Sequence, residues 1–426
     1  MEKIEISNKQ LNEKYFHYKH PSGLNIYLYP KKGYSSIYAI FGTNFGSINN
    51  KFKIGDSSDV IQVPDGIAHY LEHKLFESED GDAFSKYAKT GASANAYTSF
   101  EKTAYLFSCS KNFEESLKIL INFVQSPYFT EETVKKEQGI IGQEIKMYED
   151  DPEWRALFNV LNAMYNNHPV KIDIAGTVES IAKITPDYLY KCYNAFYNLN
   201  NMSLCIAGNI DIENTLSIID KELKPSKPTN VETILPQEPY SIVKDKVEEE
   251  FDIMSPIFYL GFKGKSDNLW MSEEKAAYID IILIAVASKS SDLYSILLEK
   301  GLINTASFSY EHFEGPGYSS ILFSGESKDP DEVAKIIREY LSNLLDKGLD
   351  EETFIRAKKV SYGSYVKEFN SVSALSNEML NNSFNGRELF KSMEYVSKAK
   401  LEKANMYLKE IFNISKSSLS IAKPRG

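Results

Sequence analysis

The chain has 426 residues, a formal net charge of −11 and three cysteines. This length exceeds one ordinary hydrophobic core and predicts two or more domains. A hydrophobic content of 42% and a charged content of 25% are typical of a globular protein in water. The excess of negative charge argues against a nucleic acid as partner, because its phosphates would be repelled.

The cysteines and the apolar segments predict the compartment. Cys109, Cys192 and Cys205 have no CxxC spacing and cannot all pair, which favours a reducing environment. The segment from Met1 to Tyr15 is polar and has no apolar stretch of the signal-peptide kind. The longest apolar run, from Ile281 to Ala287, is too short to span a membrane. We therefore expect a cytoplasmic protein with no membrane span.

The first predicted elements are strands that lead to a helix. A turn at Pro21–Gly23 precedes the alternating segment 24–29, which is typical of a strand. A second strand is predicted over residues 36–41. Pro64, Asp65 and Gly66 then break the chain immediately before a predicted helix.

That helix carries the pattern His-x-x-Glu-His at residues 69–73. Apolar residues recur every four positions, which is helical spacing: Ile67, Leu71 and Leu75. His69 and His73 are also four apart, so both imidazoles leave one face and can bind the same zinc ion. Glu72 borders that face without having to be a ligand. The pattern therefore predicts a metal site with a general base beside it.

A structural role is the ordinary alternative for any helical histidine. The chain has only six histidines, so this five-residue pattern is an uncommon coincidence, and we favour the metal site. The other four have no partner at ligand spacing, and we expect structural or exposed positions for them: His17, His20, His168 and His312.

Two strands are predicted after the helix. Residues 92–100 are small and polar for a strand, whereas residues 104–108 are more apolar. Such a pair can form the edge of a sheet, where an extended peptide adds as one more strand. The alternative is an ordinary hairpin, and without the neighbouring metal motif we would prefer it.

Helical patterns dominate residues 112–196, and two glutamates there share a face. Glu137 and Glu144 are seven residues apart, which is two helical turns. A carboxylate on a helix anchored in the core is a plausible third zinc ligand. From the residues alone, a pair of solvated glutamates is the better interpretation, because glutamate is mostly exposed.

The chain then shows a linker and a repeat. Residues 224–240 are irregular and rich in proline, which is typical of a linker. Leu106–Ser108 recurs at Leu322–Ser324, and Ser203–Ala207 recurs at Ser418–Ala422, at offsets of 216 and 215. Two unrelated matches at nearly the same offset indicate a duplicated unit.

The fold class predicted is α+β, with two homologous domains of mixed sheet flanked by helices. We place the domains at residues 1–223 and 241–426, joined by the linker 224–240. The positions equivalent to the metal motif in the second copy cannot rebuild a zinc site, because they are Ala285, Ser288 and Lys289. The second copy is therefore expected to act as a wall or lid, enclosing with the first a space that excludes bulk water.

With these features, the sequence resembles the pitrilysin–insulinase–mitochondrial processing peptidase family of zinc metallopeptidases. The resemblance covers nearly the whole chain. It is specific at His69–His73, at the helix with Glu137 and Glu144, and at Asn95-Ala96-Tyr97-Thr98. His168-Pro169 and Ile174–Thr177 also look like landmarks of the family.

The resemblance implies roles for these residues. It makes Glu144 the third zinc ligand and Glu137 a companion acid with a role in the site. It makes Asn95, Ala96 and Tyr97 part of a substrate-binding edge strand. The closest likeness is to short bacterial members that act as two-subunit enzymes, in which each subunit is half of a clamshell.

One departure from the family concerns the second half of the chain. Many relatives carry an arginine and a tyrosine there that contact the substrate, and this sequence has Leu298 and Asn304 instead. The resemblance therefore implies a heterodimer, in which a homologous, metal-free subunit supplies the arginine and the tyrosine. The only nearby cation is Lys300.

The predicted function is a zinc-dependent endopeptidase that cleaves short unstructured peptides in an enclosed chamber. His69, His73 and Glu144 would bind Zn²⁺, Glu72 would act as the general base, and Glu137 would assist it. Two alternatives stay open: a non-catalytic structural subunit and a module that binds peptides without cutting them. The ligand set and Glu72 argue against the first, and metal content with a cleavage assay of Glu72→Gln would separate all three.

Overall fold

A computed structural model describes residues 1–79, 81–266 and 269–425 of the chain. These residues form two compact units, and each unit combines segments that are distant in the sequence. Unit 1 comprises Met1–Ile145, Asp173–Ile234 and Lys367–Phe390. Unit 2 comprises Lys146–Ile172, Leu235–Val366 and Lys391–Gly426.

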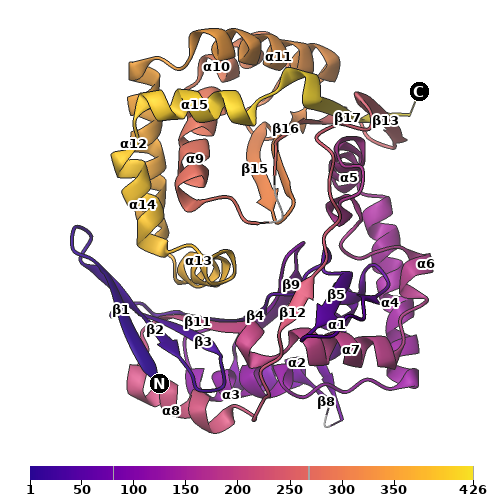
Figure 1. The fold of residues 1–426 in the computed structure, drawn as a ribbon, viewed down its shortest axis with the longest axis vertical. Helices are drawn as coiled ribbons and strands as arrows, with labels where there is room; N and C mark the ends of the chain where they lie inside the picture. Colours follow the sequence, from indigo (N-terminus) through magenta and orange to yellow (C-terminus); the bar gives the residue numbers. More distant parts are fainter. Residues whose placement is uncertain (80, 267–268, 426) are drawn as a thin grey trace. The chain divides into compact units, whose positions relative to one another are not determined.

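Unit 1 is built on a seven-stranded sheet in the order β1-β2-β3-β11-β4-β10-β9, with β1 and β9 at its edges (Figure 1). Its strands are antiparallel except for the parallel pair β3 and β11. They are β1 (Glu2–Asn8), β2 (Glu13–Lys19), β3 (Asn25–Pro30), β4 (Ile37–Thr43), β9 (Ser93–Thr98), β10 (Thr103–Cys109) and β11 (Met202–Gly208). The strands expected at residues 24–29, 36–41, 92–100 and 104–108 are confirmed as β3, β4, β9 and β10.

Helices and short strands surround this sheet. The helices of unit 1 are α1 (Ile67–Leu75), α2 (Ala83–Thr90), α3 (Phe113–Val124), α4 (Glu131–Glu149), α6 (Val178–Ile181), α7 (Pro186–Phe196), η2 (Leu199–Asn201), α8 (Ile212–Glu222) and α13 (Val372–Asn385). Its short strands are β5 (Lys51–Ile54), β6 (Ile61–Gln62), β7 (Glu77–Ser78), β8 (Gly81–Asp82) and β12 (Val231–Thr233). α4 continues from unit 1 into unit 2, because the boundary between the units lies after Ile145.

Unit 2 contains a five-stranded sheet in the order β13-β17-β14-β16-β15. Its strands are β13 (Lys246–Phe251), β14 (Ile257–Lys263), β15 (Ser309–Gly315), β16 (Tyr318–Glu326) and β17 (Ser417–Pro424). This order matches the last five strands of the first sheet, β3-β11-β4-β10-β9, and the equivalent pair β13 and β17 is again parallel. The repeat predicted from short sequence matches is therefore present as a repeat of sheet topology.

Unit 2 also contains helices from both halves of the sequence. They are α5 (Pro152–Met164), η1 (Pro169–Lys171), α9 (Glu273–Ala287), α10 (Asp292–Glu299), α11 (Pro330–Lys347), α12 (Glu351–Glu368), α14 (Leu389–Lys398), α15 (Leu401–Ile411) and η3 (Ile414–Lys416). Strands and helices together confirm the α+β class.

Each unit contains one packed helix from the other half of the sequence, α5 in unit 2 and α13 in unit 1. α5 belongs to the first half of the sequence, yet it packs on β14 and β17 in unit 2. The equivalent helix α13 belongs to the second half and packs on β4 and β11 in unit 1, as Figure 1 shows. The units therefore differ from the continuous spans 1–223 and 241–426, because each one is completed by a helix from the other half.

α9 forms the centre of unit 2. Its side chains belong to one buried cluster with Phe258 and Phe262 of β14 and Phe323 of β16. By length and composition, the helical stretch Glu273–Glu299 could cross a membrane, but 56% of its apolar window is buried in the protein. The stretch is also divided into α9 and α10, and the Ser291 side chain caps α10. These features assign it to the core of the unit.

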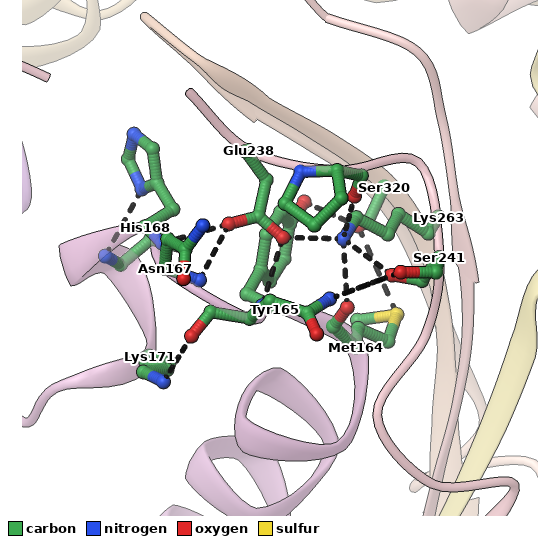
Figure 2. Close-up of polar contacts among 12 residues, drawn as sticks. Met164, Tyr165, Asn167, His168, Lys171, Glu238, Ser241, Lys263 and Ser320 are labelled. Atoms are coloured by element: carbon green, nitrogen blue, oxygen red, sulfur yellow. Dashed lines mark hydrogen bonds and ion pairs between the residues drawn. The ribbon is translucent and has the colours of Figure 1, made fainter. Parts of the chain in front are cut away.

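A buried ion pair anchors the end of the predicted linker in unit 2 (Figure 2). The Glu238 carboxylate lies 2.6 Å from the Lys263 ammonium group, and 7% and 2% of these side chains are exposed. The carboxylate also accepts hydrogen bonds of 2.7–2.8 Å from three successive backbone N–H groups, those of Asn166, Asn167 and His168. Burial raises the pKa of Glu238, but the hydrogen bond from Lys263 and the three backbone N–H groups outweigh it and hold the pKa below its usual value.

Lys263 also forms several hydrogen bonds besides its ion pair with Glu238. Its ammonium group donates to the backbone carbonyls of Met164, Pro239 and Ser241 at 2.8–2.9 Å. His168 is fully buried; its Nε2 bonds the Pro316 carbonyl and its Nδ1 accepts from Val170. The structural role expected for His168 is confirmed.

We expect Glu238→Ala to lower the free energy of unfolding by about 3–5 kcal/mol, because it leaves a buried ammonium group and three N–H groups without their anion. Urea denaturation measures this change. Glu332→Ala, which removes an exposed partner of Lys335, is the matched control and should have a much smaller effect. Equal losses in the two variants would contradict a special contribution of the buried pair.

Candidate active site

Two glycines fix the start of α1, the helix with the metal motif. Gly66 has φ 87°, and a Cβ atom there would lie 2.3 Å from the Ala175 carbonyl oxygen. Gly176 has φ 76°, and its Cβ would lie 2.6 Å from the Asp65 carbonyl oxygen. The Ser180 hydroxyl donates to the same Asp65 oxygen at 2.8 Å. The segment that looked like a landmark in the sequence thus holds the turn from which α1 begins.

α1 is buried along nearly its whole length, including His69 and Glu72. It contacts β9, β10 and α7, and the Tyr70 hydroxyl donates to the Val134 carbonyl of α4. α1 and α4 are therefore held together inside unit 1. This contact brings together two motifs that are about 70 residues apart in the sequence.

The structure brings His69, His73 and Glu144 together. Their donor atoms all lie within 4.8 Å of one another. Glu144 Oε1 is 3.7 Å from Nε2 of His69, and Glu144 Oε2 is 3.3 Å from Nε2 of His73. Ligand atoms of a tetrahedral zinc ion, with bonds of about 2.0–2.1 Å, lie roughly 3.3 Å apart. Two imidazoles and one carboxylate at these distances fit zinc.

Glu137 contacts the second histidine from the other side. Its Oε1 lies 3.1 Å from Nδ1 of His73. A carboxylate at Nδ1 holds a proton there, so Nε2 is the nitrogen that faces a metal ion once His73 has lost its second proton. Burial acts to lower the pKa of His73, but its hydrogen bonds to Glu137 and Glu144 outweigh burial and raise the pKa to about 10.

His69 is in a different electrostatic state. Burial, helped by the neighbouring His73, lowers the pKa of His69 to about 4. Its ring is therefore neutral at pH 7, which is the form that binds a metal. Its Nδ1 is buried and has no hydrogen-bond partner in the described part of the chain.

Glu72 is near the metal-ligand group but is not one of its three members. Its side chain is 8% exposed, and burial raises the pKa of its carboxyl group. Its Oε2 accepts a hydrogen bond of 2.7 Å from the Thr98 hydroxyl. Glu72 and His73 line a pocket of about 520 Å³ in unit 1. This is a suitable place for a base that acts on a molecule in the pocket.

The predicted substrate strand is β9, at the edge of the first sheet. Asn95 and Ala96 line the same pocket as Glu72 and His73. Tyr97, in contrast, donates its hydroxyl to Asn377 of α13 at 3.2 Å. β9 therefore joins the pocket to the exchanged helix α13.

The positions of the expected arginine and tyrosine lie in unit 2. Leu298 is 37% exposed near the end of α10. The Asn304 amide is engaged locally, since its oxygen accepts from the backbone N–H groups of Ala306 and Ser307. Neither side chain can replace the family's arginine as a cationic donor.

The sequence did not indicate the hydrogen-bond partners of Glu72 and Tyr97. Thr98 is 26 residues from Glu72, and Asn377 is 280 residues from Tyr97. No spacing rule connects such pairs, because they meet only through the packing of α1 and α13 on the sheet. The motif containing Thr98 was visible, but nothing in it pointed to Glu72.

Two family models match the chain. The family model described as "Insulinase (Peptidase family M16)" matches residues 56–178, which include all the candidate metal ligands. The model described as "Peptidase M16 inactive domain" matches residues 183–361. Two successive parts of the chain thus match different models, and the second model is described as an inactive domain.

Individual relatives cover nearly the whole chain. The chain is 41% identical over 414 residues to YmfH of Bacillus subtilis, described as an uncharacterized zinc protease, with 95% of each chain covered. It is also similar to an M16-like peptidase structure from Alicyclobacillus acidocaldarius, with a TM-score of 0.93, 32% identity, and coverage of 99% of this chain and 100% of the other.

A protease structure from Helicobacter pylori shares the fold, with a TM-score of 0.80, 20% identity, and coverage of 97% of this chain and 100% of the other. The family resemblance expected from His69–His73 and the helix of Glu144 is confirmed. From its sequence, its fold and these relatives, the chain belongs to the M16 (insulinase) family of peptidases.

Proposed function

We propose that this chain is a zinc-dependent endopeptidase that cleaves short unstructured peptides. The observation that carries the proposal is the convergence of His69, His73 and Glu144 within 4.8 Å, with Glu72 on the same helix. The relatives described as zinc proteases support it. In this proposal the two histidines and Glu144 hold the ion.

A zinc ion bound by these residues supplies Lewis-acid polarisation of the scissile carbonyl and lowers the pKa of water. The chain's own residues transfer the protons and orient the ligands. Glu72 takes the proton from the attacking water molecule and gives it to the leaving amine, as a general base and then a general acid. Glu137 keeps the proton of His73 on Nδ1, so that Nε2 stays available.

Strand β9 is proposed to bind the peptide backbone. Among the described residues, β9 ends the strand order of its sheet, and Asn95 and Ala96 line the pocket beside Glu72. An extended peptide that adds to this edge would place its backbone along the pocket. Main-chain pairing selects extended chains rather than particular sequences, which suits unstructured peptides.

We further propose that the working enzyme is a cytoplasmic heterodimer. Leu298 and Asn304 leave this chain without the arginine and tyrosine that contact substrate in many relatives. A homologous, metal-free subunit would supply them and close the chamber, each subunit being half of a clamshell. The rival proposal is a non-catalytic subunit that holds peptides or other proteins.

The test compares the purified chain alone with the chain plus its homologous partner, copurified from the native host. Each sample is assayed on an unstructured fluorogenic peptide, with and without a chelator, after its zinc content has been measured. We expect about one zinc per chain. We expect slow cleavage by the chain alone, and cleavage faster by tens to hundreds of fold with the partner, if the added arginine acts as an oxyanion-hole donor does.

The outcomes separate the proposals. Cleavage that the chelator abolishes and zinc restores supports the peptidase, whereas zinc-loaded samples that never cleave support the non-catalytic subunit. A chain that cleaves equally fast alone and with its partner retains the peptidase but overturns the heterodimer. Mutation of the partner's arginine should remove most of the gain.

A further inference from the structure

We infer that Thr98 is the positioning residue for the proposed base: its hydroxyl holds one oxygen of Glu72, so that the other oxygen is presented to the pocket. The inference rests on the proposed peptidase function and deepens it. Thr98 is the last residue of β9, the strand proposed to bind the peptide, and Glu72 belongs to α1. The contact therefore joins the substrate strand to the base.

The geometry of the contact is that of a strong hydrogen bond. The Thr98 hydroxyl lies 2.7 Å from Oε2 of Glu72, and the carboxylate is largely buried. Hydrogen bonds to an ionised acceptor are shorter and stronger than neutral ones. In the described part of the chain, Oε1 of Glu72 has no hydrogen-bond partner, while the residue lines the pocket. One oxygen is held and the other is available.

The direction of the bond follows from counting protons. Thr98 faces Thr103 across the β9–β10 ladder, with their hydroxyl oxygens 3.3 Å apart. The Thr103 hydroxyl donates its single proton to the Phe45 carbonyl at 2.8 Å. It therefore offers Thr98 only lone pairs. The Thr98 proton goes to the nearer and charged acceptor, Glu72, and the threonine pair keeps this orientation.

Neighbouring residues fix the strand on both sides. Successive side chains of a strand point to opposite faces. Thr98 bonds Glu72 of α1, and Tyr97 bonds Asn377 of α13. A peptide paired with β9 would thus be held by the same strand that holds the base. Strand β9 would therefore contact both the bound peptide and, through Thr98, the Glu72 carboxylate.

Thr98→Val tests the role, because valine keeps the shape of threonine and loses the hydroxyl. We expect kcat to fall about 10–100-fold, as for the loss of a hydrogen bond to a charged group, with KM changed less than about threefold. Thr98→Ser restores the donor and should recover kcat to within about threefold of wild type. Thr215→Val is the matched control, since Thr215 is a buried threonine of unit 1 that bonds the Asp211 carbonyl. It should leave kcat unchanged.

Two further readouts exclude a merely structural effect. In a Glu72→Gln background, Thr98→Val should reduce the residual rate less than about threefold, because the group that it positions is already inactive. Zinc content and the affinity of the metal-free chain for a labelled peptide, measured by fluorescence anisotropy, should stay at wild-type values in Thr98→Val.

The possible results are distinguishable. If Thr98→Val keeps the wild-type kcat while cleavage remains zinc-dependent, this inference fails and the peptidase proposal stands. If peptide affinity falls and kcat does not, Thr98 belongs to peptide binding and the inference is overturned. If the wild-type assembly cleaves no peptide, the proposed function fails, and the role of Thr98 fails with it.

Discussion

Glu72→Gln should retain about one zinc per chain and lose peptide turnover by 10²–10⁴-fold. That range is the typical contribution of a positioned general base. The amide of glutamine cannot accept the proton of the attacking water, but its oxygen can still accept the Thr98 hydrogen bond. The helix should therefore stay folded, and the loss should appear in kcat. Steady-state kinetics together with metal analysis measure both quantities.

Glu79→Gln is the control for this experiment. Glu79 lines the same pocket and is exposed, so the same chemical change removes a carboxylate from the pocket without touching the base. Its turnover should remain near wild type. A Glu72→Gln variant within a few-fold of wild type would remove Glu72 from the catalytic role.

His73→Ala should lose most of the bound zinc while the chain stays folded. The change removes one of the three converging donors and also the ring that Glu137 orients. Two remaining ligands cannot hold the ion as three do. Its side chain is 25% exposed, so truncation leaves no sealed cavity in the core. Metal analysis after dialysis, with circular dichroism for the fold, gives the result.

His17→Ala serves as the comparison, because it removes an imidazole that bonds Asn25 on the sheet, away from the three metal donors. Its zinc content should equal that of wild type. Full zinc occupancy in His73→Ala would show that the ligand set is wrong and that the ion is bound elsewhere.

The grouping of the two candidate metal-binding histidines could be predicted because it is encoded locally. His69 and His73 are one helical turn apart, so helix periodicity alone places their rings together. Glu144 is different, because a glutamate at helical spacing is usually solvated. The residues alone favoured a solvated glutamate, whereas the family resemblance favours a zinc ligand, and in the structure Glu144 Oε2 lies 3.3 Å from Nε2 of His73. The packing of α1 against α4, through Tyr70, is what brings Glu144 to the histidines.

The repeat was predictable for a related reason. Strands equivalent in the two sheets kept similar apolar residues, so Leu106–Ser108 and Leu322–Ser324 could be matched. The exchange of α5 and α13 was not predictable. The apolar pattern of an amphipathic helix indicates that one face is buried, but it does not indicate which sheet covers that face. For the same reason, the contact between Tyr97 and Asn377 could not be foreseen.

The reciprocal exchange of α5 and α13 has a consequence for how the protein can be divided. A cut within 224–230 would separate two polypeptides, each carrying a helix that the other's sheet requires. Neither fragment could complete its hydrophobic core alone, and each would expose the apolar surface that the missing helix covers. We therefore expect the two halves to fold cooperatively, and a sequence change in either half to be constrained by the helix that the other half contributes.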